Sequence, residues 1–345
     1  MQQRWFYLNM METEKIIDKK VVYEVLANKF LGLRYTYEFA NFLMVDHFKL
    51  NYHLNKPLYY SFQVPKKNGS TRKIQSPNDD LKRIQKSLNY FLQLVYLTVK
   101  PKSVHGFVRK PGTEDVVFNI ISNASVHLNS KYVLNMDLQD FFSSVSAKQV
   151  RDVLLVEPFN FHSEIATLVA LIGSYEKKLP TGAPCSPVLA NMVCYEMDKE
   201  LESYCRTNAI NYTRYADDLS FSGNKYFEQS TIDQIKTIIN KYQFIVNTKK
   251  TRIHSSNSQQ TVTGLVVNKK VNIDRKYIRN LRAIMHHWKL NGLELATLKH
   301  FNGIYDSVKF INKIKGQVEF VGQVRGKGDG LYLKLIGIFT KLTLN

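Results

Sequence analysis

Apolar and polar positions along the N-terminal part of the chain predict helices followed by a hairpin. Apolar residues recur at helical spacing between residues 11 and 50, which predicts two short helices. They are Ile16, Ile17, Val21, Val22, Val25, Leu26 and Phe30. Residues 59–65 and 71–74 then read as strands, and the polar run 66–70 between them predicts a β-hairpin with a basic turn.

Two further extended stretches carry acids. Residues 131–138 form an apolar run that reaches Asp137 near its end. Residues 213–221 set Asp217 and Asp218 between short runs rich in Tyr, Leu and Phe, which is the pattern of a tight hairpin with carboxylates at its tip. Adjacent carboxylates repel each other, and a divalent cation relieves that repulsion. The alternative is an ordinary polar turn, in which Asp is common.

Helical periodicity returns between and after these stretches. Ser186 is expected as the N-cap and Pro187 as the first residue of a helix, with Leu189, Met192, Val193 and Leu201 on its apolar side. A second amphipathic helix, capped near Ser230, carries Ile232, Ile235, Ile238, Ile239 and Tyr242. Residues 260–267 read as a strand broken by Gly264. Asp274 is expected to cap a helix with an apolar stripe of Tyr277, Ile278, Leu281, Met285 and Trp288.

The net charge of the chain indicates the kind of partner it binds. The 345 residues carry 48 Lys and Arg against 29 Asp and Glu, a formal net charge of +19. From residue 266 onward we count 15 basic against 5 acidic residues, so over half of the excess lies in the last quarter of the chain. A polyanion is therefore expected as partner, and nucleic acid is favoured over a membrane because no basic amphipathic anchor adjoins an apolar span.

The remaining composition indicates an ordinary globular protein of the cytoplasm. Hydrophobic residues make up 44% and charged residues 22% of the chain. Cys185, Cys194 and Cys205 show neither paired zinc-ligand spacing nor the pattern of a disulfide framework, which suits a reducing compartment. No apolar run reaches the length of a membrane span, and the N-terminus lacks the apolar core of a secretion signal.

Ordered motifs give the chain a family resemblance. Tyr-Ala-Asp-Asp at residues 215–218, with Asp-x-x-x-Phe-Phe at 137–142 upstream, resembles the palm of reverse transcriptases. Other elements of that family follow in order: a fingers hairpin at 71–77, His-Gly-Phe at 105–107, a block similar to Leu-Pro-Gln-Gly at 179–182, Asn-x-x-Lys-Thr at 247–251 and thumb-like sequence at 314–322. The resemblance covers residues 55–325, and such an order is rarely produced by chance.

The resemblance implies an α+β fold with the right-hand architecture of polymerases. An N-terminal helical segment (1–50) would precede fingers (51–130), a palm (131–265) with a small antiparallel sheet backed by helices, and a helical thumb (266–345). The implied activity is RNA-directed DNA polymerase, a nucleotidyl transfer from deoxynucleoside triphosphates with two Mg²⁺ ions, for which Mn²⁺ can substitute. Asp137 and Asp217 would be the principal ligands, with Asp218 beside them and the Leu138 carbonyl as a further ligand.

Four residues are expected at the nucleotide by the same resemblance. Arg72 and Lys250 would contact the triphosphate, Lys250 also as proton donor to the pyrophosphate, and Phe142 would lie under the sugar. Gly182 would let the backbone approach the ligand closely. The chain departs from the family at Thr181, where Gln is usual, so the corresponding side-chain contact is not expected here.

Two motifs resemble markers of the retron branch of the family. Asn123-Ala124-x-x-His127 and Val262-Thr263-Gly264 match elements that set retron reverse transcriptases apart. This implies a cognate structured noncoding RNA as template and primer, a branched RNA–DNA product (multicopy single-stranded DNA), a separate effector protein and a role in defence against phage. Asn123 and His127 are expected to contribute to RNA binding, and Arg275, Arg279 and Arg282 to contact the backbone of the template-primer duplex.

Alternative readings lie inside and outside the enzymes. A group II intron-like or other bacterial reverse transcriptase shares the motifs, although the sequence after the thumb leaves little room for a maturase or endonuclease domain. A scaffold that binds RNA–DNA and restrains an effector is the second alternative, and the intact acids favour an active enzyme over it. A nucleotide cyclase is disfavoured because the hairpin lacks that family's Gly-Gly turn.

Overall fold

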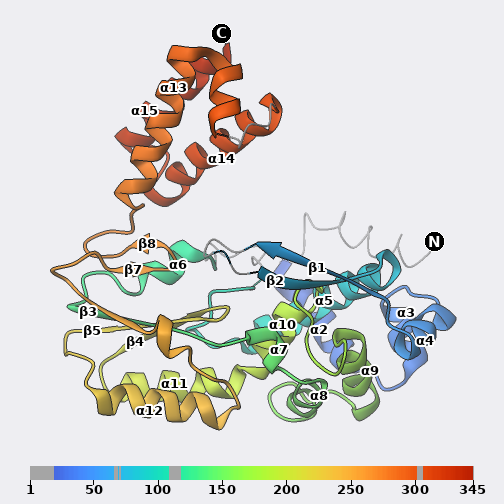
Figure 1. The fold of residues 1–345 in the computed structure, drawn as a ribbon. Helices are drawn as coiled ribbons and strands as arrows, with labels where there is room; N and C mark the ends of the chain where they lie inside the picture. Colours follow the sequence, from blue (N-terminus) through green and yellow to red (C-terminus); the bar gives the residue numbers. More distant parts are fainter. Residues whose placement is uncertain (1–18, 66–68, 70, 109–117, 301–305, 345) are drawn as a thin grey trace. The chain divides into compact units, whose positions relative to one another are not determined.

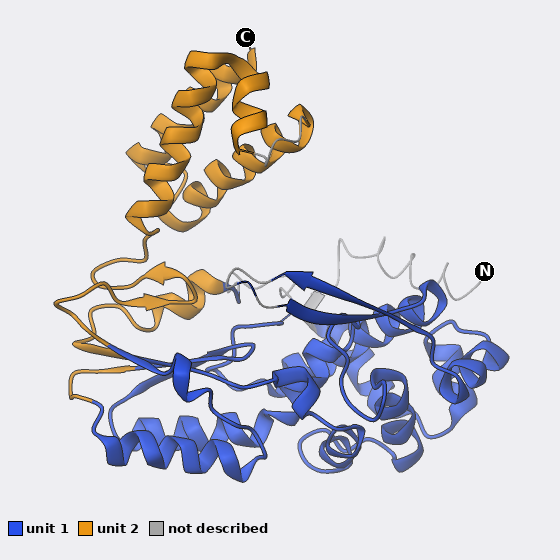
Figure 2. Ribbon diagram, in the orientation of Figure 1, with its two compact units in different colours: residues 1–119, 134–221, 227–253 blue, residues 120–133, 222–226, 254–345 orange. Residues whose placement is uncertain are grey.

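The structure is a computed structural model that describes residues 19–65, 69, 71–108, 118–300 and 306–344. The chain divides into two compact units (Figure 2). Unit 1 comprises residues 1–119, 134–221 and 227–253, and unit 2 comprises residues 120–133, 222–226 and 254–345. The fingers, palm and thumb boundaries expected from sequence remain predictions.

Unit 1 begins with helices that pack around aromatic side chains. In the described part, α2 (Lys19–Leu31), α3 (Thr36–Phe42) and α4 (His47–Asn55) replace the two helices expected before residue 50. Phe30 is fully buried and its ring stacks on those of Phe42 and Phe91, each at 5.5 Å between centroids. Such ring contacts tie α2 and α3 to the long helix α5 (Asp79–Val99).

The predicted N-terminal hairpin is present. β1 (Tyr59–Pro65) pairs antiparallel with β2 (Thr71–Pro77), with Phe62 opposite Ile74 and Val64 opposite Arg72. Most of its expected basic turn, residues 66–68 and 70, lies outside the described residues. Because directly paired residues share a face of the ribbon, Arg72 and Ile74 lie on the same face as Phe62 and Val64.

A small sheet carries the predicted acids. Its strands run in the order β4 (Asn211–Tyr215), β5 (Asp218–Gly223), β3 (Tyr132–Asp137) and β6 (Arg252–Ser255). Two helices, α11 (Tyr195–Thr207) and α12 (Gln229–Lys241), lie along one face of this sheet (Figure 1). The expected α+β class, with a sheet backed by helices, is confirmed.

The helices between β3 and β4 correct two details of the sequence analysis. They are α7 (Phe141–Ser144), α8 (Ala147–Leu155), α9 (Ser163–Gly173) and α10 (Ser186–Val193). Cys185, and not Ser186, is the N-cap of α10, and the Ser186 hydroxyl donates to the Pro180 carbonyl at 2.8 Å. The apolar side expected for one helix belongs to two, because the chain breaks at Cys194 and Leu201 lies on α11.

Two smaller boundary differences follow later in the chain. The N-cap of α12 is Glu228, two residues before the expected Ser230. The stretch 260–267 is a hairpin of β7 (Thr261–Val262) and β8 (Leu265–Val266) and not one interrupted strand. Thr263 and Gly264 at its turn both have positive φ, as two-residue hairpins of the type I′ class require.

Unit 2 is largely helical. It contains α6 (Ile120–Ser125), the β7–β8 hairpin, α13 (Arg275–His300), α14 (Ser307–Arg325) and α15 (Gly330–Leu344). The predicted Asp274 cap is present, since its carboxylate accepts from the Lys276 amide at 2.7 Å. The stripe Ile278, Leu281, Met285 and Trp288 is buried against Phe310, Val318 and Leu335. α13 continues past Leu290 across a kink at Gly292, whose φ is 78°.

The cysteines are free and buried in unit 1. Burial raises the pKa of Cys185, Cys194 and Cys205 to about 12 in each case. Among the helices that the structure describes, none combines the length and apolar character needed to cross a bilayer.

Candidate active site

The candidate site is built on the tip of the β4–β5 hairpin. The chain reverses direction within Ala216 and Asp217, and Ala216 takes a left-handed conformation with φ of 61°. The Asp217 carbonyl accepts from the Leu138 amide at 2.9 Å, so the tip is bonded to the end of β3. The tight hairpin predicted from sequence is thus present, with Asp217 in the turn and Asp218 at the start of β5.

The structure brings the three predicted acids together. Asp137 ends β3, and its carboxylate lies near that of Asp218. Lost hydration, followed by repulsion from Asp217 and Asp137, raises the pKa of Asp218 to about 6. Burial, and then the charge of Asp137, raises the pKa of Asp217 above its usual range. These carboxylates therefore favour any arrangement that adds positive charge.

Lys250 supplies such a charge. It ends the short 3₁₀ segment η2 (Thr248–Lys250), and its Nζ donates to both carboxylate oxygens of Asp137 at 2.9 Å. The hydrogen bond to Asp137 raises the pKa of Lys250. The segment is held in place by the Asn247 amide, which donates to the Asp137 carbonyl at 2.7 Å. Lys250, expected at a triphosphate, thus lies against an acid of the same site.

The oxygen atoms of the three acids and of the Leu138 carbonyl suit a hard divalent cation, but Lys250 covers those of Asp137. Carboxylate and carbonyl oxygens are the preferred ligands of Mg²⁺. The Leu138 carbonyl faces the hairpin side, because Asp137 and Gln139 make the backbone bonds to residues 245–247 and the Leu138 amide bonds Asp217. No group of three acidic, histidine or cysteine side chains among the described residues has metal-binding geometry. The Lys250 ammonium lies on both carboxylate oxygens of Asp137, which a cation at this acid would take in its place.

Arg72 lies on β2 of unit 1, and Gly182 packs against the same strand. Arg72 on β2 is exposed, and its positive charge lowers the pKa of Asp217, acting against the larger effect of burial. At Gly182, with φ of 122°, an added Cβ would lie 2.9 Å from Ile74 Cγ2 and 3.0 Å from the Gln75 carbonyl oxygen. The Gln75 amide donates to the Thr181 carbonyl at 2.7 Å. The glycine therefore lets this loop approach β2, and its predicted approach to a nucleotide stays a prediction.

Phe141 and Phe142 differ in burial as expected, but the cause is helical geometry and not the alternation of a strand. Phe141 is 5% exposed, whereas Phe142 is half-buried and its ring lies 5.9 Å from that of Phe107. Alternation along a strand does not apply, because both residues lie on the helical turn α7. Neighbouring residues on a helix point about 100° apart, and this directs Phe141 into the core and leaves Phe142 at its edge.

His105 and Gly106 pack beneath the hairpin. His105 is 8% exposed, and burial lowers its pKa to about 4, so the imidazole is neutral near physiological pH. A Cβ on Gly106 would lie 2.4 Å from the Ala216 amide nitrogen, so only glycine permits this contact.

Arg214 is a residue of this region that sequence reasoning missed. It is fully buried on β4, two residues before the hairpin tip, and forms an ion pair with Asp198 of α11 at 2.6 Å. The sequence signal is a basic residue within a strand-like run, on the same face as Tyr212 and Ala216, where burial demands a partner.

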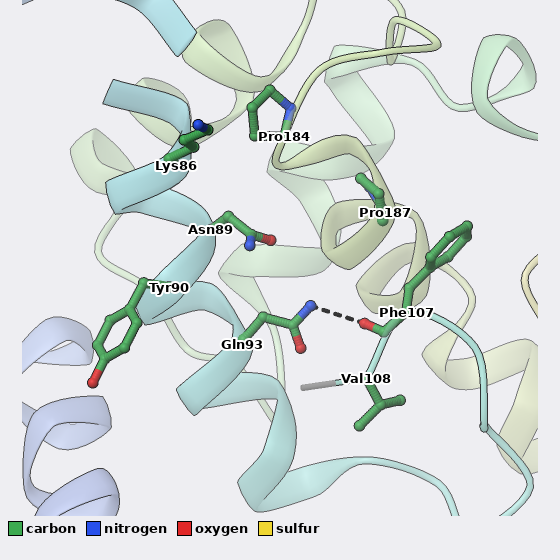
Figure 3. Close-up of a pocket in the computed structure, with 8 residues that line it drawn as sticks. All are labelled: Lys86, Asn89, Tyr90, Gln93, Phe107, Val108, Pro184 and Pro187. Atoms are coloured by element: carbon green, nitrogen blue, oxygen red, sulfur yellow. Dashed lines mark hydrogen bonds between the residues drawn. The ribbon is translucent and has the colours of Figure 1, made fainter. Parts of the chain in front are cut away.

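A groove adjoins Phe107 (Figure 3). Its volume is about 510 Å³, and one wall is a face of α5, from which the Gln93 amide donates to the Phe107 carbonyl at 2.8 Å. The opposite wall contains Pro184 and Pro187 from the loop before α10 and its first turn. The full lining is Lys86, Asn89, Tyr90, Gln93, Phe107, Val108, Pro184 and Pro187.

The predicted RNA-binding residues all lie in unit 2, in two different environments. Asn123 and His127 are fully buried, and His127 Nδ1 lies 2.8 Å from the Ser222 hydroxyl. The Asn123 amide has no hydrogen-bond partner among the described residues. Arg275, Arg279 and Arg282 are exposed on α13. The roles of all five residues in RNA binding remain predictions. Because Asn123 and His127 are buried, they could act only by supporting a surface that binds RNA.

Comparison with known proteins supplies the family. Residues 64–267 match the model of the family described as reverse transcriptase (RNA-dependent DNA polymerase). The chain is 32% identical over 275 residues to the retron Mx65 reverse transcriptase of Myxococcus xanthus, covering 74% of this chain and 61% of that protein. It is 34% identical over 235 residues to the retron Ec86 reverse transcriptase of Escherichia coli, covering 66% and 69%.

The chain therefore belongs to the reverse transcriptase family, as the fold and the clustered acids indicate. Within that family it is a bacterial retron-type reverse transcriptase, so this prediction from the two marker motifs is confirmed. Family membership also confirms the predicted polymerase fold class.

Proposed function

We propose that this chain synthesises DNA on an RNA template. In this reaction a primer hydroxyl attacks the α-phosphate of a deoxynucleoside triphosphate, a new phosphodiester bond forms, and pyrophosphate leaves. The observation that carries the proposal is the meeting of Asp137, Asp217 and Asp218 at one end of a small sheet, with Lys250 against them. Such a cluster, in which the pKa values of Asp217 and Asp218 are raised, is expected where a polyphosphate and its cations bind.

Divalent cations complete this site in the proposal. Two Mg²⁺ or Mn²⁺ ions would acidify the primer hydroxyl and neutralise charge on the phosphates. Asp137, Asp217, Asp218 and the Leu138 carbonyl would hold them, since all four present oxygen ligands around the hairpin tip. Lys250 would leave Asp137, and its ammonium would then face the triphosphate and donate a proton to the departing pyrophosphate.

The neighbouring side chains would hold the nucleotide and template. Arg72 would bind the triphosphate, and Phe142 at the core's edge would exclude a 2′-hydroxyl by its bulk. The groove beside Phe107 would take the unpaired template strand, because Asn89, Tyr90 and Gln93 offer uncharged hydrogen-bonding groups and a ring face.

We further propose that the template is a cognate structured noncoding RNA. The two marker motifs support this, because they pack together in unit 2: the Thr263 hydroxyl donates to the Ile120 carbonyl of α6 at 3.4 Å. Synthesis would begin from a 2′-hydroxyl of a guanosine in that RNA and leave a branched RNA–DNA molecule. A role in phage defence, in the cytoplasm and with a separate effector protein, completes the proposal.

The test uses the purified protein with an RNA template, a DNA primer, deoxynucleotides and Mg²⁺. Extension of the primer by wild type is expected, and no extension under any divalent cation would overturn the proposal. For the retron-specific part, the protein is expressed with the noncoding RNA encoded beside it. Single-stranded DNA whose mobility changes after debranching enzyme treatment is expected, and unbranched DNA alone would overturn that part.

A further inference from the structure

A buried ion pair lies directly beneath the catalytic hairpin. The Arg214 guanidinium donates to both oxygens of Asp198, from Nε at 2.8 Å and from Nη2 at 2.6 Å. Its remaining nitrogen, Nη1, donates to the Asn191 side-chain oxygen at 3.0 Å and to the Ala216 carbonyl at 3.1 Å. Both members of the pair are 0% exposed, so solvent does not screen these contacts.

The hydrogen bond from Arg214 to the Ala216 carbonyl links the ion pair to the hairpin tip. This carbonyl belongs to the peptide that joins Ala216 to Asp217, which is the last peptide before the acid. Ala216 itself is left-handed, a conformation that is unfavourable for an alanine and needs support from the surrounding structure. Arg214 thus holds Ala216 at its carbonyl. Gly106 packs against the Ala216 amide nitrogen so closely that a Cβ added to Gly106 would lie 2.4 Å from it.

The same guanidinium is fixed to the rest of unit 1. Asp198 on α11 also accepts from the Tyr212 hydroxyl at 2.8 Å, and the Asn191 amide donates to the Gly106 carbonyl at 3.0 Å. On the backbone side, the Arg214 amide donates to Ser103 and its carbonyl accepts from His105, both at 2.9 Å. Arg214 therefore connects the hairpin tip to two helices and to the segment below it.

We propose that Arg214 is a positioning residue, which through the Ala216 carbonyl sets the place of Asp217 and thereby the affinity of the acids for divalent cations. The inference rests on the proposed function. A buried ion pair contributes little net stability, and apolar residues of similar volume often replace it without loss. The planar fork of arginine is needed here, because Asp198 takes two donors while a third nitrogen serves Asn191 and Ala216.

The decisive variants separate position from stability. Arg214→Lys keeps the charge and loses the fork. The double variant Arg214→Met with Asp198→Leu removes both members of the pair. Arg214→Met alone would leave a buried unpaired carboxylate, which is strongly destabilising. Leu201→Val is the matched control, since Leu201 is fully buried on the same helix as Asp198 and is not in the network.

Mn²⁺ binding to the protein without nucleic acid is measured by calorimetry, and the thermal midpoint is measured alongside. We expect Arg214→Lys and the double variant to bind Mn²⁺ about tenfold to a hundredfold more weakly, the range seen when residues that orient metal ligands are replaced. The Mg²⁺ concentration for half-maximal primer extension should rise by the same factor, with an unchanged KM for the primer-template. Leu201→Val should lower the thermal midpoint and leave Mn²⁺ affinity unchanged.

Wild-type Mn²⁺ affinity in both Arg214 variants would overturn the inference and leave the proposed function standing. The same holds if Leu201→Val weakens Mn²⁺ binding as much as they do, because the effect would then follow general stability. If wild type neither binds Mn²⁺ nor extends primers, the proposed function fails, and this inference fails with it.

Discussion

The hairpin tip of unit 1 and the basic side of α13 in unit 2 are organised in opposite ways. At the tip, the backbone is held by close contacts: Gly106 packs against Ala216, and the buried Arg214 guanidinium donates to the Ala216 carbonyl. On α13, Arg275, Arg279 and Arg282 stand exposed around a helix whose other side is buried. One region is specified by contacts and the other by charge.

This difference indicates a division of labour. Chemistry at a phosphate needs ligands held to a fraction of an ångström, so the acids are supported by buried polar contacts. Affinity for a polyanion needs only positive charge near phosphates, and that contribution depends on salt. Changes at the tip should therefore alter turnover without altering RNA affinity, and changes on α13 should do the reverse.

The largest expected effect tests the first half of this division. Asp217→Asn should reduce primer extension by roughly 10³-fold or more, in line with losses seen when a member of a catalytic unit is removed. RNA affinity should stay within about twofold of wild type, because the basic residues are unchanged. Extension rates and filter binding on the same preparation measure both. A variant that extends primers normally would refute the assignment of Asp217 as a ligand.

The next largest effect concerns Phe142, and it tests whether this side chain selects deoxynucleotides over ribonucleotides. Phe142→Ala should improve incorporation of ribonucleotides relative to deoxynucleotides by about tenfold to a hundredfold, since a lost ring opens space for one hydroxyl. Phe142→Tyr keeps the ring and serves as the control with an unchanged ratio. Single-nucleotide incorporation of each triphosphate gives the ratio directly, and equal ratios in all three proteins would leave Phe142 as a core residue only.

A smaller effect tests whether the exposed arginines of α13 supply affinity for RNA. Replacing Arg275, Arg279 and Arg282 together by Ala should reduce the slope of log affinity against log salt by about 2–3, at ~0.9 per phosphate contact on duplex DNA. Cognate and unrelated structured RNAs should be affected by similar factors, because RNA duplexes hide their base edges. The control replaces Lys148, Lys199 and Lys236, which lie on helices of unit 1. An unchanged slope in the arginine variant would place the RNA elsewhere.

The smallest effect is a pH dependence of the tip. The pKa of Asp218 is raised from 3.8 to about 6, so the native protein holds this proton more tightly than the unfolded chain does. Without divalent cation, stability should therefore fall as pH rises from the lower value through the higher one. Added Mg²⁺ should bind the deprotonated form, and its stabilisation should be lost as pH falls below about 6.

Thermal midpoints with EDTA and with Mg²⁺ measure this, at a pH on each side of the Asp218 transition. The Mg²⁺-induced rise should amount to about 1–2 °C, which is what about 1 kcal/mol produces in a chain of this size. Asp218→Asn is the control in which the pH dependence of that rise should be much reduced. A rise of equal size in wild type at both pH values would show that Asp218 is not a ligand.

Local patterns account for what sequence could predict. The β1–β2 hairpin and the acids of the β4–β5 hairpin are encoded within a few neighbouring residues, so spacing and motif suffice for them. The break at Cys194 was missed because apolar positions continue on both sides of it, and periodicity alone does not show a change of helix axis.

The contacts that sequence did not predict join distant parts of the chain. Lys250 and Asp137 are 113 positions apart, and the pattern around each gives no sign of the other. Arg214 and Asp198 are 16 positions apart on different elements, and each alone reads as an ordinary charged residue. Which charges meet in a core is decided by the packing of elements, and local periodicity carries no such information.

The buried cysteines give the protein a practical property. Maleimide reagents react with the thiolate, and the raised pKa values of Cys185, Cys194 and Cys205 leave almost none of it near neutral pH. A single cysteine introduced at an exposed position such as Lys289 on α13 should therefore take up a fluorophore alone. Site-specific dye labelling can proceed in the natural background, without first removing three side chains from the core.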